Sequence, residues 1–282
     1  MDTMDRRAWV GISALGVGVL VLLLVIFSSV RDTGQQLLNL FRVQEVQTVQ
    51  ITQEFLDSLP EPDAELIQWV EEPSGDGEAR EVTLAEAEDA LGFRLAQLAA
   101  LPDNLQTDPK VTITDAEEAS FTIDLPTARN YIWALGGDGA ILPDTMEGAV
   151  FGVTMPQVGM LFYAAKENPE QGVRLIQTTS PTLAVPGEID MDAIRAGLLE
   201  LEILPQDLAA QLRAVSDWES TLLLPLVEGM SEEVNVGSAT AVRFFGVDDD
   251  DRMLVWVAQD RIHVLSTNIP ELDLTALAEN VR

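Results

Sequence analysis

The sequence predicts an α+β protein in which an N-terminal transmembrane helix precedes an antiparallel sheet with packed helices. Residues 8–30 contain no charged side chain, although the chain as a whole is strongly acidic. After residue 81, short segments rich in β-branched and aromatic residues are interrupted at irregular intervals by capped amphipathic segments. Parallel βαβ units would require strands and helices to alternate regularly, so we expect an antiparallel sheet.

The uncharged segment Ala8–Val30 is long enough to cross a membrane. As a helix it would span about 34 Å, at roughly 1.5 Å per residue, against a hydrocarbon core of roughly 30 Å. Arg6 and Arg7 precede it and Arg31 follows it, which favours a cytoplasmic N-terminus. We therefore expect a cytoplasmic stub (1–7), a transmembrane helix (8–30) and an extracytoplasmic remainder.

Two other interpretations of this segment remain open. A cleaved signal peptide would have an apolar run of roughly 7–15 residues ending in a small-x-small site, and "IFSSVRDTG" is a poor match. A buried helix of a soluble protein is the other alternative. The sequence favours an uncleaved signal-anchor over both.

The next expected region is a juxtamembrane segment and linker (31–81). Residues 46–52 are rich in β-branched side chains and predict a strand. Residues 57–81 are rich in proline, glycine and acids and predict a mobile linker, with an apolar docking point at Leu66, Ile67 and Trp69. We expect the domain that follows to fold without residues 1–80.

The extracytoplasmic domain (82–282) contains helices with clear start and stop signals. Thr83 and Glu86 form a capping-box pattern before a short helix that ends at Gly92. The other expected elements are two strands around an acidic turn (110–125), a helix from Pro126 to Gly136, two strands with Pro156 near their turn (148–166), a strand and an edge (174–186), helices that start at Asp190 and Pro205, a strand (221–227), a three-stranded meander (238–267) with turns at Asp248–Asp251 and Gln259–Asp260, and a closing helix (270–281).

Composition limits the classes of partner. The formal net charge is −31, which argues against binding to nucleic acid or anionic lipid, because both require a basic surface. The acidity favours a well-solvated surface or, as the alternative, a basic partner. Cysteine is absent, so neither disulfides nor thiol chemistry contribute.

Residues with possible chemistry have simpler structural explanations. His263 is the single histidine, and any serine triad would have to use it, but it lies in the middle of a predicted strand, where we expect a half-exposed position. No Gly-x-Ser-x-Gly motif is present. The glycine-rich segment 134–140 lacks a P-loop lysine and predicts a helix stop and loop.

Asp248–Asp251 is the most concentrated group of charges. Four consecutive carboxylates cannot all face one ion, and the alternating ligands of an EF-hand loop are missing, so we expect a solvated turn rather than a Ca²⁺ site. A pair of catalytic carboxylates has no characteristic spacing in the sequence. With 47 acidic residues in the chain, such a pair remains an open alternative. We expect no catalytic residue, no cofactor and no bound metal.

The segment "VTLAEAEDALGFRLAQLAALPDNL" and the end of the chain, "MLVWVAQDRIHVLST" with "LDLTALAENV", resemble a known family. It is a domain of unknown function in the extracytoplasmic parts of bacterial membrane-anchored regulators, notably anti-sigma factors, and of some lipoproteins. The resemblance covers about residues 82–282. It implies a curved antiparallel sheet with helices, distantly like lipoprotein-carrier sheets, and no catalytic residues. Because only about seven residues precede the anchor, we do not expect a conventional anti-sigma factor.

Three functions are consistent with these observations. The favoured one is a non-catalytic, membrane-tethered extracytoplasmic sensor or accessory domain of the bacterial cytoplasmic membrane that binds another membrane or extracytoplasmic protein. The second is a carrier that holds a lipid or other apolar ligand on its sheet. The third is an enzyme with a carboxylate pair. The concave face of the sheet distinguishes the three functions. We expect it to be filled by helices in a protein-binding domain, open and apolar in a carrier, and lined by facing acids in an enzyme.

Overall fold

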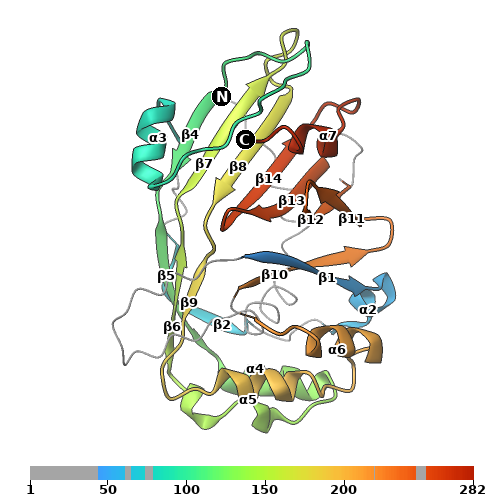
Figure 1. Cartoon of the computed structure of the whole chain (residues 1–282). Helices are drawn as coiled ribbons and strands as arrows, with labels where there is room; N and C mark the ends of the chain where they lie inside the picture. The colour runs from blue at the N-terminus through green and yellow to red at the C-terminus, as the bar shows by residue number, and fades with distance from the viewer. Residues whose placement is uncertain (1–43, 61–64, 74–78, 219, 246–251) are drawn as a thin grey trace.

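The computed structural model describes residues 44–60, 65–73, 79–218, 220–245 and 252–282. The expected stub (1–7), transmembrane helix (8–30) and Asp248–Asp251 turn lie outside these residues. Within the described residues, no helix is both long and apolar enough to cross a membrane. The described part is a mixed α+β structure, as predicted (Figure 1).

The larger sheet has eight strands, and each pair of neighbours is antiparallel. The predicted meander supplies three of these strands, and its Gln259–Asp260 turn is confirmed by positive φ values of 54° and 59°. In spatial order the strands are β11 (Ser231–Val236), β12 (Ala239–Phe244), β13 (Arg252–Ala258), β14 (Arg261–Thr267), β8 (Gly172–Thr178), β7 (Val158–Ala164), β4 (Lys110–Thr114) and β3 (Arg80–Glu81).

The smaller sheet has four antiparallel strands and continues the larger one (Figure 1). In spatial order they are β2 (Ile67–Glu71), β5 (Glu117–Ile123), β6 (Val150–Met155) and β9 (Thr182–Ala184). The chain passes directly from β4 to β5, from β6 to β7 and from β8 to β9. Three long segments therefore run from one sheet into the other.

This continuity corrects two of the predicted turns. The strands on either side of Asp115 and on either side of Pro156 exist, but they do not pair with each other. In each case a two-residue interruption breaks the hydrogen-bond ladder without reversing the chain. Pro156 has no N–H to donate at such a break.

The third sheet is a parallel pair, which the antiparallel prediction missed. The predicted strand at 46–52 is confirmed as β1 (Glu45–Ile51), and its register with β10 (Thr221–Val227) is parallel over seven residues. The short helix α2 (Gln53–Ser58) follows β1, and Phe55 on it is buried. Val49, Ile51 and Phe55 pack in one apolar cluster with residues of β10 and of the later helix α6.

The predicted helices form, and their capping signals explain their ends. They are α3 (Leu84–Leu91), α4 (Leu125–Ala134), α5 (Met191–Leu198), α6 (Gln206–Arg213) and the closing helix α7 (Leu274–Ala278). The Thr83–Glu86 capping box is complete, and Gly92 ends α3 in the left-handed region at φ 70°. Asp124 and Asp190 cap α4 and α5 through their side chains.

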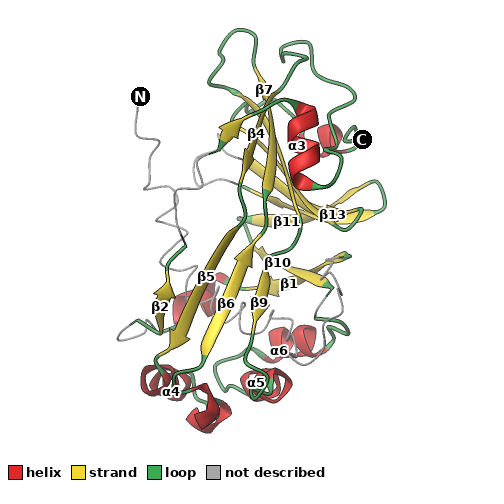
Figure 2. Ribbon diagram, turned by 90° about the vertical axis from the view of Figure 1, so that its left-hand side faces the viewer, coloured by secondary structure: helices red, strands yellow, loops and turns green. Residues whose placement is uncertain are grey.

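Helices cover one face of each sheet. α3, the segment 93–105 and α7 bury the apolar side chains of β4, β7, β8, β13 and β14 in one core. α4 and α5 pack against β5 and β6 in a second core at the other end of the molecule (Figure 2). The core of the predicted domain is therefore divided between two ends of a continuous sheet.

The prediction that residues 57–81 form a mobile linker is wrong in part. Residues 67–71 and 80–81 are strands β2 and β3, at the edges of the two sheets. The high content of proline and acid in this range predicted a linker. The short stretch "IQWVE" within it nevertheless has the composition of a strand and pairs with β5.

Candidate functional site

The edge strand β2 is the surface with the strongest features of a binding site. It is the outermost strand of the smaller sheet (Figure 2), and none of the described residues pairs with its other edge. Ile67 lies opposite Ile123, and Trp69 lies opposite Phe121. A bulge between Trp69 and Glu71 shifts the register by one residue.

Two consecutive apolar side chains of β2 are exposed. Trp69 is 44% exposed and Val70 is 56% exposed. The indole ring meets the ring of Phe121 edge-on, with centroids 5.9 Å apart and an interplanar angle of 78°. Phe121 in turn stacks on Phe151, which is only 2% exposed. Trp69 is therefore a surface residue supported by the core.

Two hydrogen bonds join the beginning of β2 to Asp124, the residue that caps α4, and a third joins the earlier residue Pro60 to α4 itself. The backbone N–H of Asp124 donates to Leu66 O (3.0 Å), and Gln68 Nε2 donates to Asp124 Oδ2 (3.3 Å). Tyr131 Oη donates to Pro60 O (3.0 Å). The same Asp124 carboxylate caps α4, and the hydrogen bond from the backbone N–H of Thr127 lowers its pKa. β2 thus begins at a hydrogen-bonded corner with the N-terminal end of α4.

The surroundings of β2 are acidic. Glu65, Glu71 and Glu72 are exposed, and none of them forms an ion pair with a residue in the described ranges. Ser120 Oγ donates a hydrogen bond to Glu71 Oε2 (3.3 Å). On β3 and β4, at the edge of the larger sheet, the cations Arg80 and Lys110 are already paired, with Asp115 and Glu81 respectively. The edge therefore carries net negative charge beside its apolar pair.

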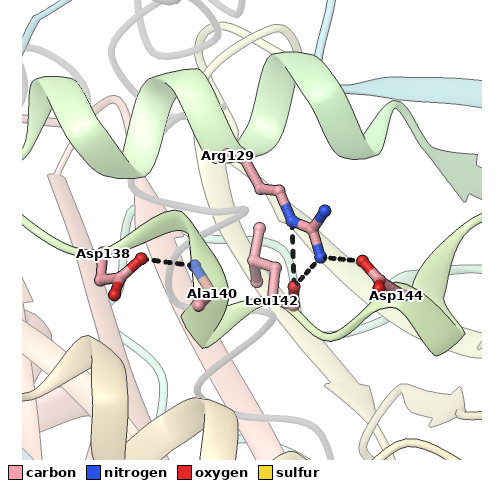
Figure 3. Close-up of polar contacts among 5 residues, drawn as sticks. All are labelled: Arg129, Asp138, Ala140, Leu142 and Asp144. Atoms are coloured by element: carbon pink, nitrogen blue, oxygen red, sulfur yellow. Dashed lines mark hydrogen bonds and ion pairs between the residues drawn. The ribbon is translucent and has the colours of Figure 1, made fainter.

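The glycine-rich segment 134–140 is a helix stop and an ordered loop, as predicted (Figure 3). Arg129 of α4 donates to Leu142 O through Nε (3.1 Å) and Nη2 (2.6 Å) and pairs with Asp144 (2.6 Å). Asp138 Oδ1 accepts from the backbone N–H of Ala140 (2.9 Å). The guanidinium holds the loop that contains the short turns η1 (Gly139–Ile141) and η2 (Asp144–Met146).

His263 is buried, so the expectation of a half-exposed residue is wrong. It is 5% exposed, because its side of the sheet lies under the segment 93–99. Gln177, opposite it on β8, fixes that segment by bonding both the N–H (2.8 Å) and the carbonyl (2.9 Å) of Ala96. The imidazole stacks on Trp256 at 5.0 Å and 13°, and its Nε2 lies 3.3 Å from Ala258 O.

The surroundings of His263 favour the neutral ring. Burial lowers its pKa from 6.5 to about 4. Nδ1 has no hydrogen-bond partner among the described residues, so no carboxylate orients the ring as in a serine triad. The ring therefore acts as a packing group on the sheet.

The two faces of the larger sheet differ. The face toward α3 and α7 is filled by the apolar core. On the opposite face, the cross-strand row Val264, Ile176 and Met160 is half-buried, and Thr112 at its end is buried with its hydroxyl unpaired within the described structure. Val264, Ile176 and Met160 form an apolar row, and the next row of the same face, Lys110, Phe162, Arg174 and Ser266, contains two cations and no acid.

Groups of three or more metal-binding side chains do not occur in the described ranges. No family model, curated protein or solved structure matches the chain. The sequence did single out Leu66, Ile67 and Trp69 as a docking point. The structure divides these residues, since Leu66 packs against the core of the smaller sheet, whereas Trp69 is exposed and contacts that core through Phe121. The strand periodicity of "IQWVE" was the available signal, but it does not reveal which edge of a sheet stays open.

Proposed function

We propose that this chain is a membrane-tethered extracytoplasmic accessory or sensor domain that acts by binding another protein and has no catalytic activity. The tether is the uncharged segment 8–30, and Arg6 and Arg7 orient it with the N-terminus in the cytoplasm. The binding surface is the edge of β2. The described domain then lies outside the cytoplasmic membrane.

One observation carries the proposal of protein binding: Trp69 and Val70 are exposed side by side on an unpaired strand edge. Natural proteins usually protect such edges, because they invite pairing with another chain. Tryptophan is also enriched among the residues that contribute most to protein interfaces. The core support from Phe121 and Phe151 means that little side-chain freedom would be lost on binding.

Crosslinking in intact membranes tests the binding surface. A photoreactive amino acid at Val70 should give a discrete adduct with another protein. Met230, which is 48% exposed in the turn between β10 and β11, is the matched control position and should not give that adduct. Absence of an adduct at position 70, or the same adducts at both positions, would contradict the proposal.

The second candidate function is a carrier of an apolar ligand. The half-buried row Val264, Ile176 and Met160 favours it, because a lipid chain could lie along such a face. Titration of the full chain with a fluorescent fatty acid tests this function. Saturable one-to-one binding that Ile176→Glu abolishes and Val70→Ala leaves unchanged would favour the carrier over the protein-binding domain.

A further inference from the structure

We infer that the partner binds by strand addition: an extended segment in which basic residues alternate with β-branched or aromatic residues becomes the next strand beside β2. The inference rests on the proposed function and specifies the chemistry of the partner. It follows from the backbone, the side chains and the charge of this edge.

The backbone of β2 provides the template. One edge of Ile67–Glu71 is hydrogen-bonded to β5, and the outer edge has no partner within the described ranges. An added strand gains affinity from main-chain hydrogen bonds and specificity from its alternate side chains. The corner formed with Asp124 and Gln68 holds the template in place before binding.

Trp69 provides the apolar anchor. A residue directly opposite it on an added strand would have its Cβ about 4.5–5.5 Å away, within reach of the indole ring. Aromatic and β-branched residues form the favourable cross-strand pairs. The alternation of the partner segment therefore places one such residue beside Trp69.

The acids select for positive charge and against a second copy of this chain. Glu65, Glu71 and Glu72 lie at or next to β2, without an ion pair to any described residue. Two β2 edges paired with each other would bring these acids together, and the chain carries a net charge of −31. Lysine or arginine on the added strand would instead neutralise them.

The test uses the full chain in lipid nanodiscs and a blocked peptide of four Lys-Val repeats. Binding is measured by calorimetry and its location by hydrogen exchange. We expect saturable binding and slower exchange at residues 67–71. A Glu-Val peptide of the same length should not bind. A fully N-methylated Lys-Val peptide keeps the charges but loses its donors, and it should bind about tenfold more weakly or worse.

Variants of the protein locate the contacts. Trp69→Ala should weaken binding about tenfold or more, and the charge reversals Glu71→Lys with Glu72→Lys should abolish it without touching the core. Met230→Ala is the matched control and should bind as the parent does. If Trp69→Ala impairs folding, as monitored by exchange elsewhere in the chain, the charge-reversed variant decides.

Three results would overturn the inference. The N-methylated peptide could bind as tightly as its parent, which would reduce the interaction to charge alone. The protection could appear outside residues 67–71. It could also appear without peptide and grow with protein concentration, which would make a second copy the occupant. In each case, a specific crosslinked adduct at Val70 would still support the proposed function. Absence of that adduct would contradict both the proposed function and the inference of strand addition.

Discussion

At the scale of single residues, His263 shows how position on a sheet decides chemistry. The sequence identified it as the residue that any serine triad would have to use, but strand periodicity alone could not tell which face of the sheet would be covered. The structure places it beneath the segment 93–99, beside Trp256 and Gln177. The buried, neutral imidazole therefore affects how the stability of the fold depends on pH, rather than catalysis.

We predict that His263 destabilises the fold in acid. Its pKa is about 4 in the folded protein and near 6.5 when the chain is unfolded. As the pH falls, the unfolded chain therefore binds the proton before the folded protein does. The contribution of the neutral ring to the free energy of unfolding is complete above pH 6.5 and is lost as the pH falls toward 4. The slope is about 1.4 kcal/mol per pH unit, for a total of about 3 kcal/mol.

Urea unfolding between pH 7 and pH 4 measures this effect. His263→Gln serves as the control, because it keeps a polar side chain of similar size without a titrating ring. The free energy of unfolding of the parent should fall more steeply than that of the variant over this range. Parallel curves for the two proteins would show that His263 is not buried as a neutral group.

At the scale of elements, close approach of strands imposes glycine at particular positions. A Cβ on Gly172 would lie 2.3 Å from Tyr163 O, which belongs to the backbone of the neighbouring strand β7. Gly152, in β6, is the contrasting case, because its nearest contact would be Ala184 Cβ at 3.4 Å. Neither glycine has a positive φ, so the difference is one of space alone.

We predict that Gly172→Ala destabilises the protein by about 2 kcal/mol or more, because β7 and β8 must separate to admit the methyl group. Gly152→Ala should stay within about 1 kcal/mol of the parent. Thermal unfolding of both variants checks the comparison. Equal melting temperatures for the two variants would contradict the register assigned to β7 and β8.

Local signals predicted the elements well, but they did not predict strand partners. Thr83, Gly92, Asp190 and Pro205 mark helix boundaries through bonds made within a few residues, so the sequence shows them directly. The passage from β4 to β5 looks like a hairpin in sequence, because a two-residue break and a turn have similar composition. The parallel pairing of β1 with β10 joins segments 176 residues apart and has no local signal.

At the scale of the whole molecule, the boundary of the folded domain lies earlier than the sequence indicated. The linker prediction led us to expect that a chain without residues 1–80 would fold. The structure instead places Val49, Ile51 and Phe55 in an apolar cluster with Leu212 and Leu223. The segment before residue 80 therefore contributes to the core.

We predict that residues 44–282 fold and that residues 81–282 are severely destabilised. Loss of three buried apolar side chains, at about 1.5–3 kcal/mol each, approaches the whole stability of a typical domain, about 5–15 kcal/mol. Circular dichroism and cooperative urea unfolding distinguish the two fragments. A cooperative transition of undiminished stability in the shorter fragment would show that β1 and α2 are peripheral.

Topology is a further prediction at this scale. Protease added to intact spheroplasts should digest the domain that follows residue 30, because the two arginines before the uncharged segment favour a cytoplasmic N-terminus. The same digestion after lysis is the control. Full protection in intact spheroplasts, with digestion only after lysis, would reverse the orientation.

The candidate site combines features that the sequence shows with one that it does not. Trp69 and the acids around it are visible in the sequence, where the apolar residues predicted a docking point and the acids predicted a linker. The open edge is visible only once the order β2-β5-β6-β9 is known, because a strand becomes an edge through the absence of a neighbour. Edge position depends on the arrangement of the entire sheet.

Hydrogen exchange at β2 tests the central claim most directly. The full chain is compared in native membranes, where the proposed partner would be present, and in purified form in nanodiscs. We expect amides of residues 67–71 to exchange at least about tenfold more slowly in native membranes, because an added strand bonds the open edge. The buried strand β8 should exchange equally in both. Equal exchange at residues 67–71 in the two preparations would show that no strand is added beside β2.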